Sequence, residues 1–223
     1  MKSDKKLKIS FDEWNVWYQS AFHAQQATGW EVAPRVIEDS YNVVDAVVVG
    51  SLLISLLRHS DRVTAACLAQ LVNVIAPIRT EPDGPAWRQT IFHPFALTSR
   101  LARGEVLRVE ARSPGYETAR FGTVPVLDAV ATHDAGSGEV TVFVVNRHLT
   151  ESLDLAVSLA GFPAGLRVGE SWTLADDDLY AVNTAADPDR VVPRAAKDAE
   201  VTDGVLRAAL PPASWTAVRL TTG

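Results

Sequence analysis

The 223-residue sequence predicts an α/β segment followed by an all-β domain. Two observations predict this order. Between residues 7 and 69, a strand-like run, a long helical pattern and a second strand-like run follow one another, which is a βαβ unit with parallel strands. After Gly104, short alternating segments are separated by turn-rich stretches, which is typical of an antiparallel β-sandwich. We place the boundary at Arg103–Gly104, giving domains 1–103 and 104–223.

In the first strand, apolar and polar residues alternate over residues 7–12. Strict alternation places Glu13 on the face of the apolar residues, and places Lys8 on the opposite face. Two explanations remain open. Either Lys8 lies at a solvated rim of the sheet, or a bulge near Phe11 changes the direction in which the side chains point.

The predicted helix covers residues 37–59, with Asp39 or Ser40 as its N-cap. Apolar residues cover most of its circumference, so we expect a buried helix. The second strand, residues 63–69, is almost continuously apolar, which is typical of a strand buried on both faces. A long loop over residues 73–87 and a helix from Pro94 to Gly104 complete this part.

The second domain begins where the helical periodicity ends. Ala135–Gly138 is the type of sequence found in a hairpin turn between two strands. Apolar residues alternate with polar or small ones in seven segments, so we expect seven strands. They cover residues 105–111, 124–131, 140–145, 153–159, 167–174, 205–210 and 215–220.

Composition excludes several classes of protein. The net charge of −6 and the lack of a sustained Lys/Arg run argue against a nucleic-acid partner. No apolar segment follows the basic N-terminus, and residues 43–57 are too few to span a bilayer, so we expect neither a secretion signal nor a membrane partner. Cys67 is the only cysteine, which fits a cytoplasmic protein and a small buried side chain. The five histidines lack metal-ligand spacing and no phosphate loop is present, so we expect no metal and no cofactor.

Carboxylates, an amide and aromatic rings are concentrated in residues 10–18, directly at the end of the first strand. Carbohydrate sites need this mixture, because aromatic rings stack on sugars, amides bind hydroxyls and a carboxylate acts at the anomeric carbon. Gln70 follows the second strand. Because the carboxyl ends of parallel strands meet at one edge of a sheet, Glu13 and Gln70 are expected together, as in the active site of a barrel.

Residues 9–17, Ile-Ser-Phe-Asp-Glu-Trp-Asn-Val-Trp, resemble the nucleophile segment of glycoside hydrolase family 51, the α-L-arabinofuranosidases. Residues 66–73 and 86–90 look like later motifs of the same family, in the family's order. The resemblance implies that 1–103 is the C-terminal portion of a (β/α)8 catalytic barrel and that 104–223 is its C-terminal β-sandwich. It also implies arabinofuranosyl-containing oligosaccharides as substrates and a homo-oligomeric full-length enzyme.

The resemblance assigns Glu13 as the catalytic nucleophile, with Trp17 and Gln70 as substrate-binding residues. From the residues alone, Glu13 in a salt bridge, Trp17 in the barrel core and a capping Gln70 are the alternatives. We expect Asp12 to have a structural role. Other polar and aromatic residues are expected in loop structure or behind the site: Asn15, Asn73, Trp87 and Gln89. His23 and Trp30 either line a substrate cleft or pack locally in a loop.

One departure from the family pattern bears on activity. The family's acid/base glutamate follows an asparagine on an earlier barrel strand, and the sequence contains no Asn-Glu pair. Without general-acid assistance a glycosidase loses a factor of about 10²–10⁴ in rate, so we expect no turnover from this chain alone. Two alternatives remain: a catalytically inactive remnant whose sandwich serves structure or oligomer assembly, and a related β-glucan-cleaving glycosidase.

Overall fold

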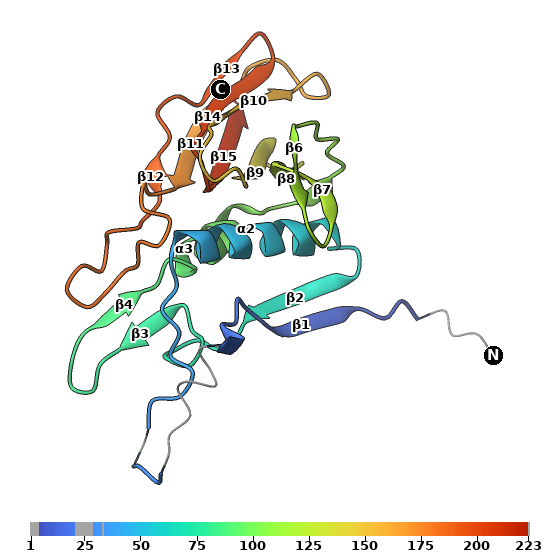
Figure 1. The fold of residues 1–223 in the computed structure, drawn as a ribbon. Helices are drawn as coiled ribbons and strands as arrows, with labels where there is room; N and C mark the ends of the chain where they lie inside the picture. Colours follow the sequence, from blue (N-terminus) through green and yellow to red (C-terminus); the bar gives the residue numbers. More distant parts are fainter. Residues whose placement is uncertain (1–4, 21–28, 33, 223) are drawn as a thin grey trace.

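The computed structural model describes residues 5–20, 29–32 and 34–222. Strand β1 (Ile9–Trp14) pairs in parallel with β2 (Val63–Leu68), and helix α2 (Val43–Arg58) connects them. The predicted βαβ unit is therefore confirmed. Figure 1 shows α2 lying between this strand pair and the large sheet of the C-terminal half.

Helix α2 begins later than the sequence pattern predicts, because its N-cap is Asn42 and not Asp39 or Ser40. The Asn42 side chain accepts a hydrogen bond from the Asp45 backbone N–H (3.1 Å), and the Asp45 carboxylate accepts one from the Asn42 N–H (2.8 Å). This reciprocal capping box satisfies two backbone donors at the helix start.

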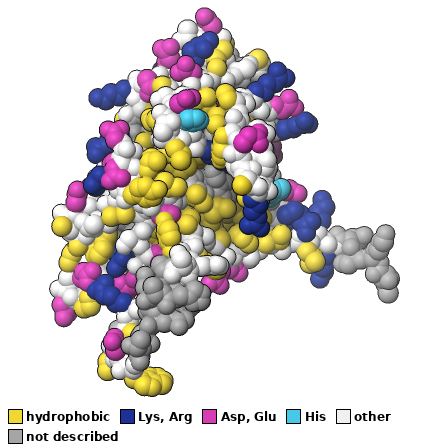
Figure 2. Space-filling view, in the orientation of Figure 1, with side chains coloured by type: hydrophobic (Ala, Val, Ile, Leu, Met, Phe, Trp, Pro, Cys, Tyr) yellow, Lys and Arg dark blue, Asp and Glu magenta, His cyan; other side chains and the backbone are white. Residues whose placement is uncertain are grey.

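Helix α2 is apolar around most of its circumference because it is packed on two sides. Val47 and Ile54 belong to a core with Phe143 and Trp215 of the sandwich. Other α2 side chains, including Leu53, pack with residues of the α/β part in a second core. The core thus crosses the predicted boundary at residues 103–104, and Figure 2 shows hydrophobic side chains gathered between the two parts.

The C-terminal half is a sandwich of a six-stranded sheet, in the order β12-β11-β15-β9-β8-β5, and a three-stranded sheet, in the order β10-β14-β13. Aliphatic side chains from both sheets form one core. The strands are β5 (Glu105–Leu107), β8 (Leu127–Asp134), β9 (Glu139–Asn146), β10 (Leu153–Ser158), β11 (Leu166–Leu174), β12 (Arg194–Ala195), β13 (Glu200–Thr202), β14 (Val205–Leu210) and β15 (Ser214–Thr222). The antiparallel sandwich is therefore confirmed.

Two hairpins were not predicted. Strands β3 (Ile78–Thr80) and β4 (Ala86–Arg88) pair within the stretch expected to be loop, and β6 (Gly115–Thr118) pairs with β7 (Gly122–Pro125). These strands have three or four residues each, too few for an alternation pattern to be recognised.

The helix predicted from Pro94 to Gly104 is present as α3 (Phe92–Leu101), but it ends before the residue predicted. The strand predicted to reach residue 111 ends at Leu107. Gly104 has a φ of +75°, and a Cβ there would lie 2.0 Å from the His133 carbonyl oxygen. Gly104 therefore makes the turn from helix to strand at a point where no larger residue fits.

Strand β2 is not buried on both faces, and all six of its residues are exposed or only partly buried. Cys67 is exposed, so its predicted burial was wrong. A continuous apolar run is typical of a strand that other segments cover on both faces, but the pattern does not identify those segments. No helix among the described residues is long and apolar enough to cross a membrane.

Candidate active site at the carboxyl ends of β1 and β2

The carboxyl ends of β1 and β2 lie side by side. Trp14 is in register with Leu68, and the Ala69 backbone N–H donates a hydrogen bond to the Trp14 carbonyl (3.3 Å). Glu13 and Gln70 therefore approach the same edge of the sheet, as the parallel arrangement predicts. The peptide bond between Ala69 and Gln70 is cis.

The direction of the Glu13 side chain follows from an irregular β1. The register shifts between Phe11 and Trp14, so strict alternation is broken at the position where the sequence allowed a bulge. Trp14 turns into the core and is 6% exposed, whereas Glu13 is exposed. The Asp12 carboxylate accepts a hydrogen bond from the Ser10 hydroxyl, which is a local structural contact of the kind expected for Asp12.

Glu13 and Trp17 line one pocket of about 410 Å³. The Glu13 carboxylate makes no hydrogen bond or ion pair with any described residue, so the salt-bridge alternative finds no partner in this part of the chain. Trp17 is 50% exposed, which leaves ring surface free, and it also borders a second pocket that contains no carboxylate. Gln70 is exposed and does not line the Glu13 pocket. The complete lining is Glu13, Trp17, Tyr18, Gln19, Ile37, Asp39 and Ile75.

Asn15 fixes the backbone around this edge. Its side-chain amide donates hydrogen bonds to the carbonyls of Ala69 (2.9 Å) and Ile75, and its oxygen accepts one from the Val16 N–H (2.8 Å). One side chain thus ties the segment after β1 to the residue before Gln70 and to the pocket wall. The prediction that Asn15 acts in loop structure is confirmed.

Tyr18 anchors the segment after β1 to the start of α2. Its hydroxyl lies 2.6 and 2.8 Å from the two carboxylate oxygens of Asp45, the residue that closes the α2 capping box. Burial, reinforced by the neighbouring Asp45, raises the pKa of the Tyr18 hydroxyl. Burial likewise raises the pKa of Asp45, although the hydrogen bond from Tyr18 opposes that rise. The capped helix end therefore holds the residue directly after Trp17.

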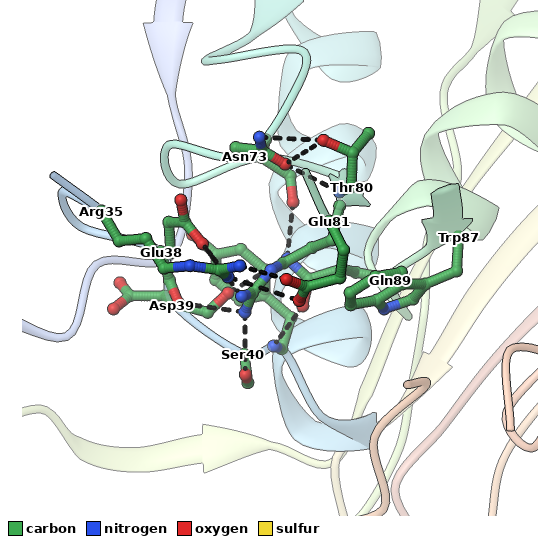
Figure 3. Close-up of polar contacts among 12 residues, drawn as sticks. Arg35, Glu38, Asp39, Ser40, Asn73, Thr80, Glu81, Trp87 and Gln89 are labelled. Carbon is green, nitrogen blue, oxygen red and sulfur yellow. Dashed lines mark hydrogen bonds and ion pairs between the residues drawn. The ribbon is translucent and has the colours of Figure 1, made fainter. Parts of the chain in front are cut away.

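Gln89 joins two walls of the pocket and is 1% exposed (Figure 3). Its oxygen accepts a hydrogen bond from the Tyr41 N–H (3.0 Å), and its nitrogen donates to the carbonyls of Asp39 (3.0 Å) and Ala76 (2.7 Å). The two carbonyls each stand next to a pocket residue, Asp39 itself and Ile75. Gln89 is therefore a structural clamp, as expected for a residue behind the site.

Two other predicted loop residues also have structural partners. Asn73 bonds the Thr80 backbone and hydroxyl, which orders the turn before β3. The Trp87 indole donates to the Asn183 carbonyl (3.1 Å), which connects β4 to a loop of the sandwich. Figure 3 shows both residues at the edge of a network in which side chains of residues 35–40 face those of the β3–β4 hairpin.

The ion pairs of this network involve Glu38 and Arg35 of the segment before α2 and residues of the β3–β4 hairpin, none of which lines the Glu13 pocket. Arg79 pairs with Glu38 (3.0 Å), and Arg35 pairs with Glu38 (3.0 Å) and with Glu81. The Arg79 guanidinium also donates to the Ser40 hydroxyl and lies 5.6 Å from the centre of the Trp87 ring. These contacts hold residues 35–40 against the hairpin.

Of the two residues expected either to line a cleft or to pack in a loop, His23 lies outside the described residues. Trp30 is fully exposed and is not part of the Glu13 pocket, so its local packing was predicted wrongly. Among the described residues, no three His, Cys, Asp or Glu side chains are arranged to hold a metal ion.

A larger pocket, of about 460 Å³, lies in the sandwich and contains none of the predicted site residues. It is lined by residues 107–114 and by mostly aliphatic side chains of β8, β9 and β10. The pocket with the chemistry of a sugar site is therefore the smaller one at the end of β1.

Sequence reasoning missed Tyr18 and Asp45, and it assigned Asp39 to the wrong role. The only signal in the sequence was polar residues close to the predicted helix start. That pattern does not show how the segment with Tyr18 is aligned with the segment with Asp45, about 25 residues further along the chain. This alignment decides which of their side chains are in contact.

Comparison with known proteins agrees with this geometry. Residues 12–214 match the family model described as the α-L-arabinofuranosidase C-terminal domain. The chain belongs to this family. A family 51 α-L-arabinofuranosidase from Bifidobacterium longum superposes with a TM-score of 0.88 at 43% identity, over 96% of this chain and 42% of that one. The GH51 arabinofuranosidase of Xanthomonas axonopodis pv. citri gives a TM-score of 0.81 at 26% identity, over 96% and 41%. The resemblance to family 51 is thereby confirmed.

Curated relatives include two named intracellular exo-α-(1→5)-L-arabinofuranosidases. The one from Streptomyces lividans is 55% identical over 220 residues, which are 98% of this chain and 33% of that protein. The one from Halalkalibacterium halodurans is 46% identical over 219 residues, which are 98% of this chain and 43% of that protein. The chain thus spans one third to somewhat over two fifths of these relatives.

Proposed function

We propose that this chain forms the C-terminal part of an intracellular retaining exo-α-L-arabinofuranosidase. Its substrates are terminal non-reducing α-L-arabinofuranosyl residues of arabinoxylan or arabinan oligosaccharides. The observation that carries the proposal is Glu13, an exposed carboxylate without a partner among the described residues, in one pocket with the half-exposed Trp17 ring. The names of the relatives support the sugar and the compartment.

In the proposed reaction, the Glu13 carboxylate attacks the anomeric carbon and forms a glycosyl–enzyme ester while the bond to the leaving oxygen breaks. A second carboxylic acid protonates that oxygen, and it then deprotonates the water that hydrolyses the ester. Trp17 offers a stacking surface for the sugar, and Gln70 offers an amide that donates to and accepts from hydroxyls. Because the second acid has no counterpart here, we assign it to the part of the relatives that this chain does not cover.

The proposal also covers the fold of the complete enzyme. We propose that β1, α2, β2 and α3 are the final elements of a (β/α)8 barrel, and that residues 104–223 are the sandwich domain that packs against α2 and α3. The exposed apolar residues of β1, Ile9 and Phe11, are 43% and 42% exposed, which fits a strand that further barrel strands cover. Homo-oligomeric assembly belongs to the same proposal.

The test is a chimera in which this chain replaces the matching third of the Streptomyces lividans enzyme. We expect the chimera to hydrolyse an aryl α-L-arabinofuranoside, and the isolated chain to show no turnover. Glu13→Ala should lower the chimera's rate by about 10³-fold or more. Added azide should restore product formation with inverted anomeric configuration, a signature of a missing nucleophile.

Asp12→Asn is the matched control, since this neighbouring carboxylate bonds only Ser10 among the described residues and should leave the rate unchanged. A chimera that cleaves an aryl glucoside or a cellooligosaccharide in preference to the arabinofuranoside would favour the glucan-cleaving alternative. A correctly folded but inactive chimera would favour the inactive remnant.

A further inference from the structure

A second carboxylate, Asp39, lines the pocket that contains Glu13 and Trp17. It lies just before the start of α2, but it does not cap the helix, because Asn42 and Asp45 form the capping box. Its backbone carbonyl is held by Gln89 (3.0 Å), so the position of the residue in the wall is fixed. This contact involves the main chain of Asp39 and not its carboxyl group.

The Asp39 side chain has few protein contacts for a residue that is only 5% exposed. One carboxyl oxygen accepts a long hydrogen bond from the Tyr18 N–H (3.4 Å), and the other is bonded to no described residue. Arg79, which acts on the Asp39 carboxyl group electrostatically, directs its hydrogen bonds to Glu38 and Ser40 instead. Nearly buried carboxyl groups normally have hydrogen-bond partners in the protein. Because one oxygen of Asp39 has no such partner among the described residues, it can accept a hydrogen bond from a molecule in the pocket.

We propose that Asp39 is a sugar-binding residue that hydrogen-bonds a hydroxyl of the arabinofuranosyl unit held against Glu13. This inference rests on the proposed function and adds one residue to its binding site. A carboxyl group accepts hydrogen bonds from hydroxyls through either oxygen. Burial also raises the pKa of Asp39, which increases the fraction that can donate as well as accept.

The position of Asp39 gives it this role without making it the catalytic acid. It is held by the same Gln89 clamp that fixes Ala76, and its neighbour on the pocket wall, Tyr18, is anchored to Asp45. Because Gln89 and the anchored Tyr18 both restrict Asp39, this residue loses little conformational freedom when a ligand binds. Asp39 therefore contributes to sugar selection, and protonation of the leaving group remains assigned to the part of the relatives outside this chain.

Binding is measured with the chimera in a Glu13→Gln background, which prevents turnover. Calorimetric titration with methyl α-L-arabinofuranoside should show that Asp39→Ala weakens binding about 10- to 100-fold, the range expected for a lost hydrogen bond to a charged group. Asp39→Asn, which keeps the size and an acceptor for Tyr18, should lose less and shows whether the protein remains folded. Asp12→Asn is the matched carboxylate-to-amide control and should bind as the parent does.

Deoxy analogues of the sugar separate ligand contact from a structural effect. For the analogue that lacks the hydroxyl bound by Asp39, the penalty of Asp39→Ala should disappear, whereas the other analogues should keep it. An Asp39→Ala variant that binds every analogue within twofold of its parent overturns the inference and leaves the proposed function intact. A chimera with Asp39 intact that neither binds nor hydrolyses arabinofuranosides would overturn the proposed function, and this inference with it.

Discussion

Replacing Gln89 by leucine removes a clamp whose three partners are all backbone groups. The side chain is 1% exposed and bonds the Tyr41 N–H and the carbonyls of Asp39 and Ala76, at 3.0, 3.0 and 2.7 Å. Leucine has nearly the same size, so the substitution mainly leaves these groups without a partner. Each buried group left unpaired costs about 1–3 kcal/mol.

The sum over three groups has an upper limit of about 9 kcal/mol, but neighbouring contributions are not additive and local relaxation recovers part of it. We therefore expect Gln89→Leu to lower the free energy of unfolding by about 3–5 kcal/mol. For a chain of this length, that corresponds to a fall in Tm of roughly 6–20 °C. Equilibrium unfolding in urea and differential scanning calorimetry measure the two quantities.

Gln70→Leu is the matched control, because this exposed glutamine bonds no described residue and its substitution should change stability by about 0.5 kcal/mol or less. Gln89→Glu tests the same contacts by pH. A glutamate there must stay protonated to donate to a carbonyl, so its folded-state pKa is raised and the variant should lose stability as pH rises above about 4. If Gln89→Leu unfolds within about 1 kcal/mol of the parent protein, the clamp does not hold the pocket wall.

Two further predictions concern packing and protonation. At Gly50 of α2 a Cβ would lie 2.2 Å from Cδ1 of the fully buried Trp215, whereas a normal contact between carbon atoms is about 3.5–4.0 Å. Gly50→Ala should therefore destabilise the protein by about 1–3 kcal/mol. This loss is expected even though alanine is favoured over glycine in a helix by roughly 1 kcal/mol. Ser51→Ala, one residue further, should be neutral or slightly stabilising in the same urea titration, and a stabilising Gly50→Ala would disprove the close packing. Burial, with a smaller effect of Arg88, lowers the pKa of His93 to about 4. The folded state therefore favours the neutral imidazole, and this contribution to stability, present above pH 6.5, should be lost as the pH falls from 6.5 through about 4. Unfolding measured at pH 7 and pH 5 should show a smaller difference for His93→Gln than for the parent, and equal differences would contradict the assignment.

Much of the architecture follows from periodicity. The alternation in residues 140–145 and 205–210 gives strands β9 and β14, and the long apolar pattern gives α2. Such patterns work because an element with one or more buried faces must repeat its apolar residues with its own period. The three- and four-residue strands of the hairpins contain too little repetition to be found this way.

Only part of the candidate site could be predicted from the sequence pattern. The order strand–helix–strand is enough to bring the ends of β1 and β2 together, and hence Glu13 and Gln70 to the same edge of the sheet. The pocket wall depends instead on tertiary register, which places Asp39 in one pocket with Glu13 and places Tyr18 against Asp45. The sequence pattern predicted Asp39 as a possible helix cap, but the helix begins after Asn42, where Asn42 and Asp45 form the capping box. This box can be recognised only from the backbone geometry.

The proposed role of Glu13 can be tested most directly by trapping the nucleophile. The chimera would be treated with an arabinofuranose-configured epoxide, which the attacking carboxylate opens to form a stable ester, and the labelled peptide would be identified by mass spectrometry. We predict a single adduct on Glu13, absent from the Glu13→Gln variant. An active chimera labelled instead on Asp12, on Asp39 or on a residue from the Streptomyces lividans portion would contradict the proposal.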